Sequence, residues 1–423
     1  MGFREFVDGI RIVKDPISVK YDMKIASESS GNEPLLFSEI IESPGQRAVT
    51  NILTRHRLCE AFNVEPGELI DILSWAMENP SDTVLLEADS APVLENRMEH
   101  TDISVLPIPW HYREDGGRYQ SSSIIIAQYG GQRNTSFHRQ LLKGPDRTTV
   151  RLVPRHLRTM ADQAFENNED VPIAVVNGPD PLVLLAAAMS FNEPIDELRV
   201  ASALHERLYG AKLGLVELPN GVQVPAESEY AMEARITTKL DDEGPYVDIT
   251  GTVDDIRQEQ VIEYDSIYHR NEPIFHALIP AGVEHMTLMG MPRAPTIKTA
   301  VSEVVTCTDV YLTDGGSGWL SSVVQIIPEN YGDSMRAIEA ALDGHKSMKQ
   351  VIVVDTDIDV TNSTRVEWAL MTRWQPDKDT LILSDQKGSS LDPSRSPDGT
   401  TSKIGIDATI DPGVDRSPFE SVL

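Results

Sequence analysis

Basic side chains are concentrated in one thirty-residue stretch, residues 129–158, of a chain whose formal net charge is −29. The basic residues of this stretch are Arg133, His138, Arg139, Lys143, Arg147, Arg151, Arg155, His156 and Arg158. Clustered positive charges repel one another unless a bound anion, or carboxylates that the fold brings close, neutralise them. The stretch therefore predicts a fold that presents this segment to an anionic ligand, with a solvated basic face as the alternative.

Composition narrows the class of protein. The chain has 423 residues, a length that predicts two or three domains. Its 66 acidic and 37 basic side chains are spread along it, and this acidic excess predicts adaptation to high salt. Such a surface repels nucleic acid, so that partner is not expected. We expect no membrane span, because no segment reaches about 18 apolar residues, and a cytoplasmic protein, because no apolar signal region opens the chain. Cys59 and Cys307 lie far apart, which argues against a disulfide framework or a zinc site.

The apolar pattern predicts an α+β protein. Residues 3–14 and 47–62 have helical spacing, whereas residues 123–128 (SIIIAQ) form an apolar, β-branched run typical of a buried strand. Further strands are predicted up to about residue 300, and residues 388–401 are predicted to form a loop. We expect three domains, at residues 1–108, 109–300 and 301–423.

Two carboxylates, Glu243 and Asp248, stand five positions apart in EGPYVD (248 − 243 = 5), with a Gly-Pro bend between them. Acids that converge on one site split their pKa values and suit general acid–base catalysis. Asn134, His156 and Glu197 could form a mixed oxygen and nitrogen site suited to manganese or magnesium, if the fold brought them together. The ordinary alternatives are a capping or surface role for His156 and a first-turn helix position for Glu197.

Several motifs stand in a fixed order along the chain. Arg139 follows Asn134 by five positions (139 − 134 = 5) and His156 comes later, IDELRVASAL contains Glu197, and VPAESEY precedes EGPYVD. GSSLDPS and SKIGIDAT, which includes Lys403, follow. Together these motifs resemble the UbiD family of reversible, non-oxidative decarboxylases, and the last two resemble its closing motif. One departure is Val247, which replaces the glycine usual in the family's E-G-P-x-G-[DE] pattern.

The resemblance implies a fold, cofactors and residue roles. The expected fold has a central split β-barrel flavin-binding domain, flanked by N-terminal and C-terminal α/β domains. The implied cofactors are prenylated FMN, a manganese ion and, as an option, a potassium ion. Asn134, His156 and Glu197 would hold the metal that anchors the flavin phosphate, and Lys403 would lie beside the cofactor. Arg139, paired with Glu243, would orient the substrate carboxylate, and Asp248 would be the acid–base group.

The segment YHRNEPIFHALIPAGVEHMTLMGMP resembles compact archaeal-type members of the family. This subgroup implies decarboxylation of trans-anhydromevalonate 5-phosphate to isopentenyl phosphate, in a mevalonate route to isoprenoids. Arg147, Arg151, Arg155 and Arg158 are the candidates for contacting the substrate phosphate. The implied partners are a flavin prenyltransferase that supplies the cofactor and further copies of the chain in a homo-oligomer. The alternatives are an aromatic acid decarboxylase of quinone synthesis and a non-catalytic flavin-binding protein.

Overall fold

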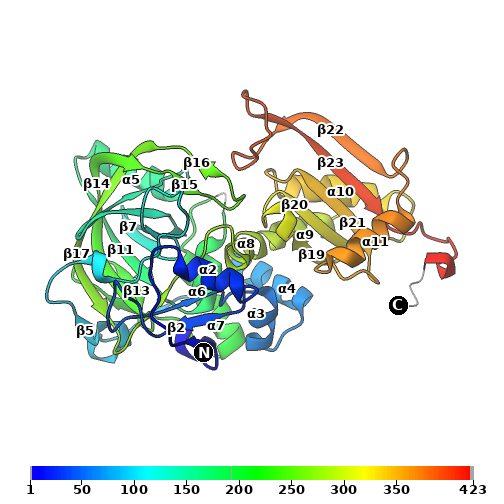
Figure 1. The fold of residues 1–423 in the computed structure, drawn as a ribbon. Coiled ribbons are helices and arrows are strands. Elements are labelled where there is room, and N and C mark those ends of the chain that lie inside the picture. The colour runs from blue at the N-terminus through cyan, green and yellow to red at the C-terminus, as the bar shows by residue number, and fades with distance from the viewer. Residues whose placement is uncertain (1, 192, 420–423) are drawn as a thin grey trace. The chain divides into compact units, whose positions relative to one another are not determined.

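The chain forms two compact units, described in a computed structural model over residues 2–191 and 193–419. Unit 1 contains residues 1–57 and 76–285, and unit 2 contains residues 58–75 and 286–423. Helices and strands are mixed throughout (Figure 1), so the predicted α+β class is confirmed. The division into three domains stays a prediction.

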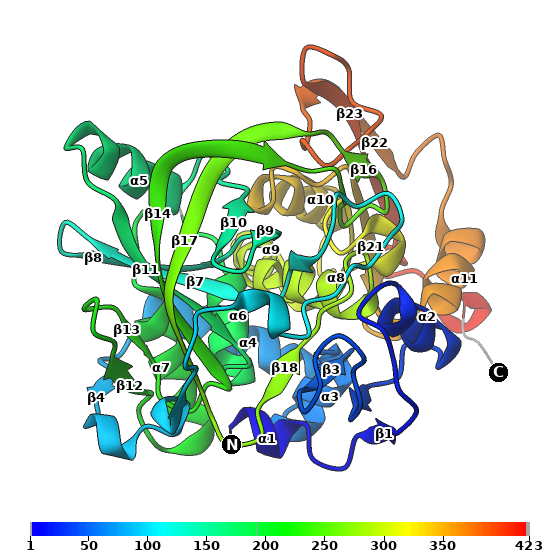
Figure 2. The same ribbon diagram turned by 60° about the vertical axis from the view of Figure 1, so that its left-hand side comes forward.

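A large antiparallel sheet dominates unit 1. Within the described chain its nine strands follow the order β6 (Tyr119–Gln120), β9 (Gln140–Gly144), β10 (Arg147–Val150), β17 (Arg257–His269), β14 (Tyr230–Glu243), β11 (Val171–Asn177), β7 (Ile124–Tyr129) and β8 (Gln132–Phe137), with β5 (Asn96–Arg97) paired to β17. The long strands β14 and β17 run side by side (Figure 2). The predicted strand at residues 123–128 is confirmed as β7, but closure of the sheet into a split barrel stays a prediction.

Three helices of unit 1 lie in the chain between strands of this sheet: α5 (His156–Glu166), α6 (Pro181–Ala188) and α7 (Glu197–Tyr209). α5 buries Leu157, Met160, Ala161 and Ala164 in the core that the sheet strands also line. Glu197 stands in the first turn of α7, the position given as its ordinary alternative, and the Asp196 side chain caps the helix by accepting a hydrogen bond from the Leu198 N–H at 3.1 Å. This cap fixes the position of Glu197, the first residue of the helix.

Smaller sheets and helices complete unit 1. Their elements are β1 (Arg11–Val13), β2 (Leu35–Phe37), β3 (Arg47–Thr50) and β18 (Ile274–His276) in one sheet, β13 (Gln223–Pro225), β12 (Gly214–Glu217) and β4 (Val84–Leu85) in a second, β15 (Tyr246–Val247) and β16 (Val253–Asp254) in a third, and helices α1 (Phe3–Phe6) and α2 (Asp22–Ser29). The helices predicted at residues 3–14 and 47–62 are wrong over β1 and β3. Ala48 and Val49 are fully buried in a strand paired with β18, so sheet pairing overrides the helical spacing.

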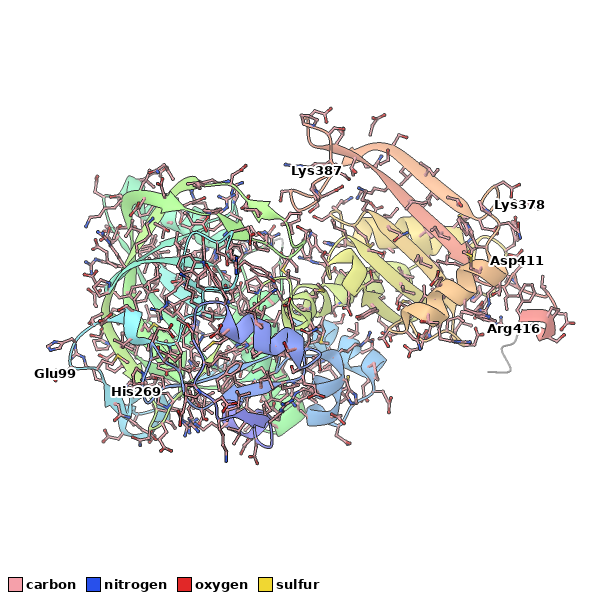
Figure 3. The ribbon with its side chains drawn as sticks, viewed as in Figure 1. Glu99, His269, Lys378, Lys387, Asp411 and Arg416 are labelled. Carbon is pink, nitrogen blue, oxygen red and sulfur yellow. The ribbon has the colours of Figure 1, made fainter. Side chains whose placement is uncertain are left out.

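Unit 2 is built on a five-stranded sheet. Its order is β19 (Thr306–Leu312), β20 (Ser321–Ile327), β21 (Gln350–Asp355), β23 (Thr400–Ala408) and β22 (Thr380–Lys387). Its helices are α9 (Ala294–Ser302), α10 (Asp333–Gly344) and α11 (Ser363–Arg373), while α3 (Arg55–Phe62), α4 (Pro66–Glu78) and α8 (Val283–Gly290) have residues in both units. Lys387 ends β22, the edge strand, and Lys378 lies in the turn before that strand begins (Figure 3). No helix in the described residues combines the length and apolarity needed to cross a membrane.

Candidate active site

The Arg139 guanidinium lies among three carboxylates in unit 1. Its Nε and Nη2 donate to Glu243 Oε1 and Oε2, both at 2.9 Å. Nη1 donates to Asp248 at 2.9 Å, and Nη2 also donates to Asp254 at 2.8 Å. The structure thus brings together the three residues predicted to carry the chemistry, and it adds Asp254, which the sequence analysis missed.

Burial differs among these groups. The Glu243 side chain is fully buried and that of Arg139 is 9% exposed, whereas Asp248 remains 27% exposed. Burial alone would lower the pKa of Arg139, but the hydrogen bonds and negative charges of Glu243 and Asp248 raise it above its ordinary value. Arg139 is therefore a permanent cation, and Asp248 is open to exchange with water, as is Asp254, which is 26% exposed.

Two tyrosines complete the surroundings of Arg139. The Tyr246 ring lies 4.6 Å from the guanidinium carbon, as a cation–π partner, and 4.6 Å from the Tyr119 ring. The Tyr119 hydroxyl donates to Glu243 Oε1 at 3.2 Å and accepts from the Gly244 N–H at 3.1 Å. Tyr119 therefore ties the Glu243 carboxylate to the backbone that follows it.

The bend after β14 directs both acids to Arg139. Gly244 has φ +103°, and a Cβ there would lie 2.6 Å from the Asp255 carbonyl oxygen, so only glycine fits. A cis Gly244–Pro245 peptide follows. Val247, the departure from the family pattern, is buried and donates its N–H to Asp115 at 2.8 Å.

The predicted metal ligands Asn134 and Glu197 also meet inside unit 1. Asn134 Nδ2 donates to Glu197 Oε1 at 2.9 Å, and the Thr135 N–H donates to Oε2 at 2.7 Å. Burial raises the pKa of Glu197 to about 8. A buried carboxylate without a cation favours its neutral form, so a divalent cation with oxygen and nitrogen ligands fits this environment.

His156, the third predicted ligand, opens α5 and is half-buried. Within the described residues, no hydrogen bond joins it to Asn134 or Glu197, so its role as a ligand stays a prediction.

A chain of hydrogen-bonded polar side chains continues along β8 from Asn134. Ser136 donates to Asn134 Oδ1 at 2.9 Å and lies 3.0 Å from His138 Nε2. The sequence analysis missed this chain, although the alternating positions 134, 136 and 138 are what one face of a strand requires.

His138 is an uncharged member of that chain. Burial lowers its pKa to about 4, although the hydrogen bond to the Arg151 carbonyl opposes this; the positive charge of Arg155 lowers it further. At neutral pH the ring is therefore neutral and able to accept a hydrogen bond.

Two histidines of unit 1 and Lys403 of unit 2 lie outside these clusters. His276 is fully buried and pairs with Glu284 at 2.8 Å. Burial lowers the pKa of His285, while the charge of Asp248 opposes this. Lys403 belongs to unit 2, where Nζ donates to the Lys346 carbonyl at 2.6 Å. Its predicted place beside the cofactor stays a prediction.

The basic stretch is largely neutralised by acids. Arg151 pairs with Glu259, and Arg158 pairs with Asp162 at 2.8 Å. Arg155 is exposed and donates from Nη1 to Ser190 Oγ at 2.8 Å. Within the described residues no carboxylate lies at ion-pair distance from Arg155, so its charge remains available to an anion.

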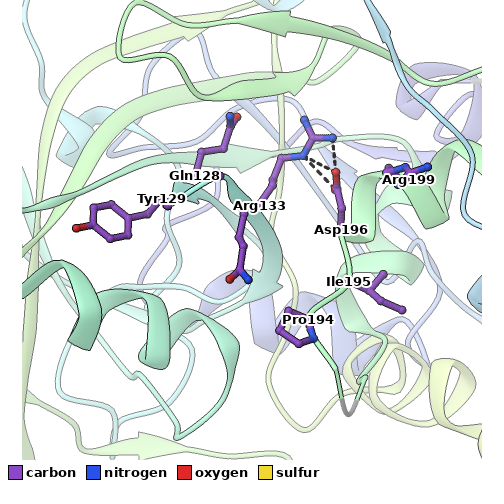
Figure 4. A pocket seen from close by; sticks show the side chains of 10 residues that line it. Gln128, Tyr129, Arg133, Pro194, Ile195, Asp196 and Arg199 are labelled. Atoms are coloured by element: carbon purple, nitrogen blue, oxygen red, sulfur yellow. Dashed lines mark hydrogen bonds and ion pairs between the residues drawn. The ribbon is translucent and has the colours of Figure 1, made fainter.

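A pocket of about 580 Å³ opens at the β7–β8 turn (Figure 4). Arg133 lines it and makes a bidentate ion pair with Asp196, at 2.6 Å for Nη2–Oδ2, while Arg199 pairs with Asp82 at 3.0 Å. Both cations of the pocket are therefore neutralised. The Arg133–Asp196 pair lies one residue before each member of the Asn134–Glu197 pair, so it fastens the same two elements.

Comparison with known proteins identifies the family. Residues 84–283 match the 3-octaprenyl-4-hydroxybenzoate carboxy-lyase Rift-related domain, and residues 286–408 match the C-terminal domain of the same carboxy-lyase. Anhydromevalonate phosphate decarboxylase of Methanosarcina mazei is 39% identical over 420 residues, covering 97% of this chain and 96% of that protein. The enzyme of the same name from Methanocaldococcus jannaschii is 37% identical, covering 99% of this chain and 98% of that protein.

Solved structures of UbiD-class enzymes resemble this chain over nearly its whole length. The UbiD-class enzyme HmfF from Pelotomaculum thermopropionicum, in complex with FMN, has a TM-score of 0.94 and 32% identity, covering 100% of this chain and 97% of that one. An evolved dimeric form of HmfF in complex with prenylated FMN has a TM-score of 0.89 and 31% identity, covering 98% of this chain and 96% of that one. This chain belongs to the UbiD family of decarboxylases, which use prenylated FMN. The family and the α+β, UbiD-class fold expected from the sequence motifs are confirmed, while the split barrel and the three-domain division stay predictions.

Proposed function

We propose that the chain releases CO2 from trans-anhydromevalonate 5-phosphate to give isopentenyl phosphate. The observation that carries this proposal is the name shared by the archaeal relatives, which match over nearly their whole length. The substrate is an α,β-unsaturated acid with a phosphate group, so it needs both a carboxylate-binding cation and a second anion-binding cation. Arg139 and Arg155 suit these two roles.

Arg139 is proposed to orient the substrate carboxylate. A guanidinium has five N–H groups, and the hydrogen bonds to Glu243, Asp248 and Asp254 use four of them. The fifth, on Nη1, remains for the substrate and lies on the nitrogen that contacts Asp248. The fully buried Glu243 holds the guanidinium plane through two parallel bonds.

Asp248 is proposed as the proton donor. As the bond between the carboxylate carbon and its neighbour breaks, CO2 leaves, and a proton from Asp248 ends on the carbon left behind. Prenylated FMN, when bound, supplies the electron sink for the electron pair of the broken bond. Asp248 is partly exposed and can recover its proton from water for the next turnover.

Asn134, His156 and Glu197 are proposed to hold a manganese ion that anchors the flavin phosphate, with a potassium ion as a further candidate. The buried contact between Asn134 and Glu197 supports two of the three ligands. Lys403 is proposed to contact the bound cofactor.

Arg155 is proposed as the cation for the substrate phosphate. It is chosen over Arg151 and Arg158 because those two are already paired with carboxylates. Arg147 is also exposed and makes no ion pair among the described residues, so it remains a second candidate. Cys59 and Cys307 are buried and form no disulfide among the described residues, and together with the −29 charge this supports a reducing, salt-rich cytoplasm. We further propose that a flavin prenyltransferase supplies the cofactor and that the chain forms a homo-oligomer.

The test uses protein produced together with a flavin prenyltransferase. Purified holoenzyme should release CO2 from trans-anhydromevalonate 5-phosphate and form isopentenyl phosphate in equal amount. The second candidate substrate is an aromatic acid. Its support is the match to gallate decarboxylase of Lactiplantibacillus plantarum, which at 27% identity is weaker than the archaeal matches. Turnover of an aromatic acid such as gallate, without turnover of the phosphorylated acid, would overturn the proposed substrate and keep the enzyme class.

A further inference from the structure

Asp115 is a buried acid outside the cluster around Arg139. It is 4% exposed, and each of its oxygens accepts a backbone hydrogen bond: Oδ1 from the Val247 N–H at 2.8 Å and Oδ2 from the Tyr112 N–H at 3.0 Å. Within the described residues no lysine or arginine forms an ion pair with it. Burial raises the pKa of Asp115 to about 6, and the negative charge of Glu114 also raises it. The two backbone hydrogen bonds and the positive charge of Arg139 lower the pKa, but burial outweighs them. A buried acid without a salt bridge costs stability, which indicates a purpose other than stability.

The hydrogen bond from the Val247 N–H ties Asp115 to the residue that precedes Asp248. Val247 immediately precedes Asp248, whose own N–H donates to the Thr252 carbonyl at 3.0 Å. The backbone on both sides of the Asp248 Cα is therefore held. Before it, Asp115 accepts the Val247 N–H and Thr252 accepts the Asp248 N–H; after it, the Asp248 carbonyl accepts the Gly251 N–H at 2.8 Å. Neither contact engages the Asp248 carboxyl group.

The neighbouring Gly116 holds the same loop at a second point. Its N–H donates to the Pro245 carbonyl at 2.8 Å. A Cβ at Gly116 would lie 2.4 Å from the Gly244 carbonyl oxygen and 3.2 Å from Pro245 Cδ. This approach is too close for any side chain, so glycine is required for residues 115–116 to lie against residues 244–247.

We propose that Asp115 is a positioning residue that sets the distance from the Asp248 carboxyl group to the reacting carbon, by holding the Val247 N–H. The inference rests on the proposed role of Asp248. Proton transfer to carbon depends steeply on donor position, and misplacement by about 1 Å can cost on the order of 100-fold in rate. The hydrogen bonds of Asp115 are to backbone N–H groups, and among the described residues none joins it to Arg139, so we expect substrate binding by Arg139 to change little without it.

The test variant is Asp115→Asn in the holoenzyme. Asparagine has the same size but one acceptor oxygen, so it cannot accept from both the Val247 and Tyr112 N–H groups. We expect kcat to fall at least tenfold with KM changed less than about twofold. The control is Asp333→Asn in unit 2, because Asp333 is also a buried acid that accepts backbone N–H groups: its Oδ2 accepts those of Glu329 and Asn330, both at 2.8 Å, while its Oδ1 pairs with Arg336. The control should lower the melting temperature without changing kcat.

A second readout isolates the proton step. An acid that delivers a proton to carbon also removes it in reverse, so the product should exchange hydrogen for deuterium in D2O. Asp115→Asn should slow this exchange at least tenfold. Gly116→Ala is the second variant, for use if Asp115→Asn does not fold. Its added methyl group would displace residues 244–245 from Gly116, so kcat and the exchange rate should fall in the same way.

The outcomes separate this inference from the proposed function. Wild-type kcat and exchange in folded Asp115→Asn, or in folded Gly116→Ala where Asp115→Asn does not fold, would overturn the positioning role while leaving Asp248 in place. Wild-type activity in Asp248→Asn would instead remove Asp248 from the proton step, and the positioning role with it. An increase in KM alone would also overturn the inference, because it would show a role in substrate binding.

Discussion

Arg139 and Glu243 face each other through two parallel hydrogen bonds of 2.9 Å, and the carboxylate is fully buried. This geometry fixes the guanidinium plane and leaves its other edge to Asp248 and Asp254. A negative charge buried at Glu243 is stable only beside a cation, so the two residues form one functional unit.

Arg139→Lys should therefore be severely impaired. An ammonium group keeps the charge but cannot present five N–H groups in one plane to three carboxylates and a substrate. We expect kcat/KM to fall by about 100-fold or more, equivalent to about 3 kcal/mol. The control is Arg235→Lys, because Arg235 on β14 also pairs with Glu263 and Asp265, at 2.6 and 2.5 Å, but lies outside the site. A comparable loss in both variants would contradict a special role for Arg139.

Asp254 should contribute to stability at neutral pH and lose that contribution in acid. Burial alone would raise its pKa, but hydrogen bonds from Arg257 and Arg139 outweigh burial and lower it from 3.8 to about 2. Because the folded pKa is the lower one, the contribution is present above about pH 4 and disappears as the pH falls toward 2. With allowance for partial exposure, it amounts to about 1–2 kcal/mol.

The measurement is the free energy of unfolding of wild type and Asp254→Asn across this pH range. The variant should be less stable at pH 6, and the difference should shrink as the pH approaches 2. Asp265→Asn is the control, because Asp265 pairs with Arg235 at the surface. A difference between wild type and Asp254→Asn that does not change with pH would refute the ion-pair explanation.

Sequence motifs predicted the family, the α+β class and the meeting of Arg139 with Glu243 and Asp248, because those residues stand at fixed spacings in matching motifs. They did not predict Asp254, which reaches Arg139 only because β16 pairs with β15 in the register Tyr246↔Asp254. They also missed Asp115, whose partner is a backbone N–H 132 positions away. Such contacts depend on tertiary register, which local spacing does not encode.

Removal of the Glu197 charge should weaken metal binding. Glu197→Gln keeps the size and an acceptor oxygen, but loses the charge that a divalent cation requires. We expect Mn²⁺ to bind at least tenfold more weakly to the cofactor-free protein, measured by electron paramagnetic resonance, and less flavin to be retained after purification. Glu233→Gln is the control, since Glu233 is a buried glutamate on β14 without a proposed role. Equal Mn²⁺ affinity in wild type and Glu197→Gln would remove Glu197 from the ligand set.

Arg155→Ala should discriminate between the two phosphates that an active site of this family must bind. If Arg155 contacts the substrate phosphate, KM should rise about tenfold or more, as loss of a charged hydrogen bond of about 1.5–3 kcal/mol implies, with flavin content unchanged. Loss of flavin at unchanged KM would assign Arg155 to the cofactor instead. Arg158→Ala should alter neither quantity, because Arg158 is already paired with Asp162. No effect of Arg155→Ala on either would show that its charge is not used.

Salt should stabilise the fold. With 66 acidic and 37 basic side chains, the net repulsion is long-ranged at low ionic strength and is screened within about 3 Å at 1 M salt. The melting temperature should therefore rise steeply between low and molar potassium chloride. Sorbitol at equal osmolarity is the control, because it leaves the charges unscreened. Equal stabilisation by both solutes would show that solute exclusion from the surface, rather than charge screening, dominates the salt response.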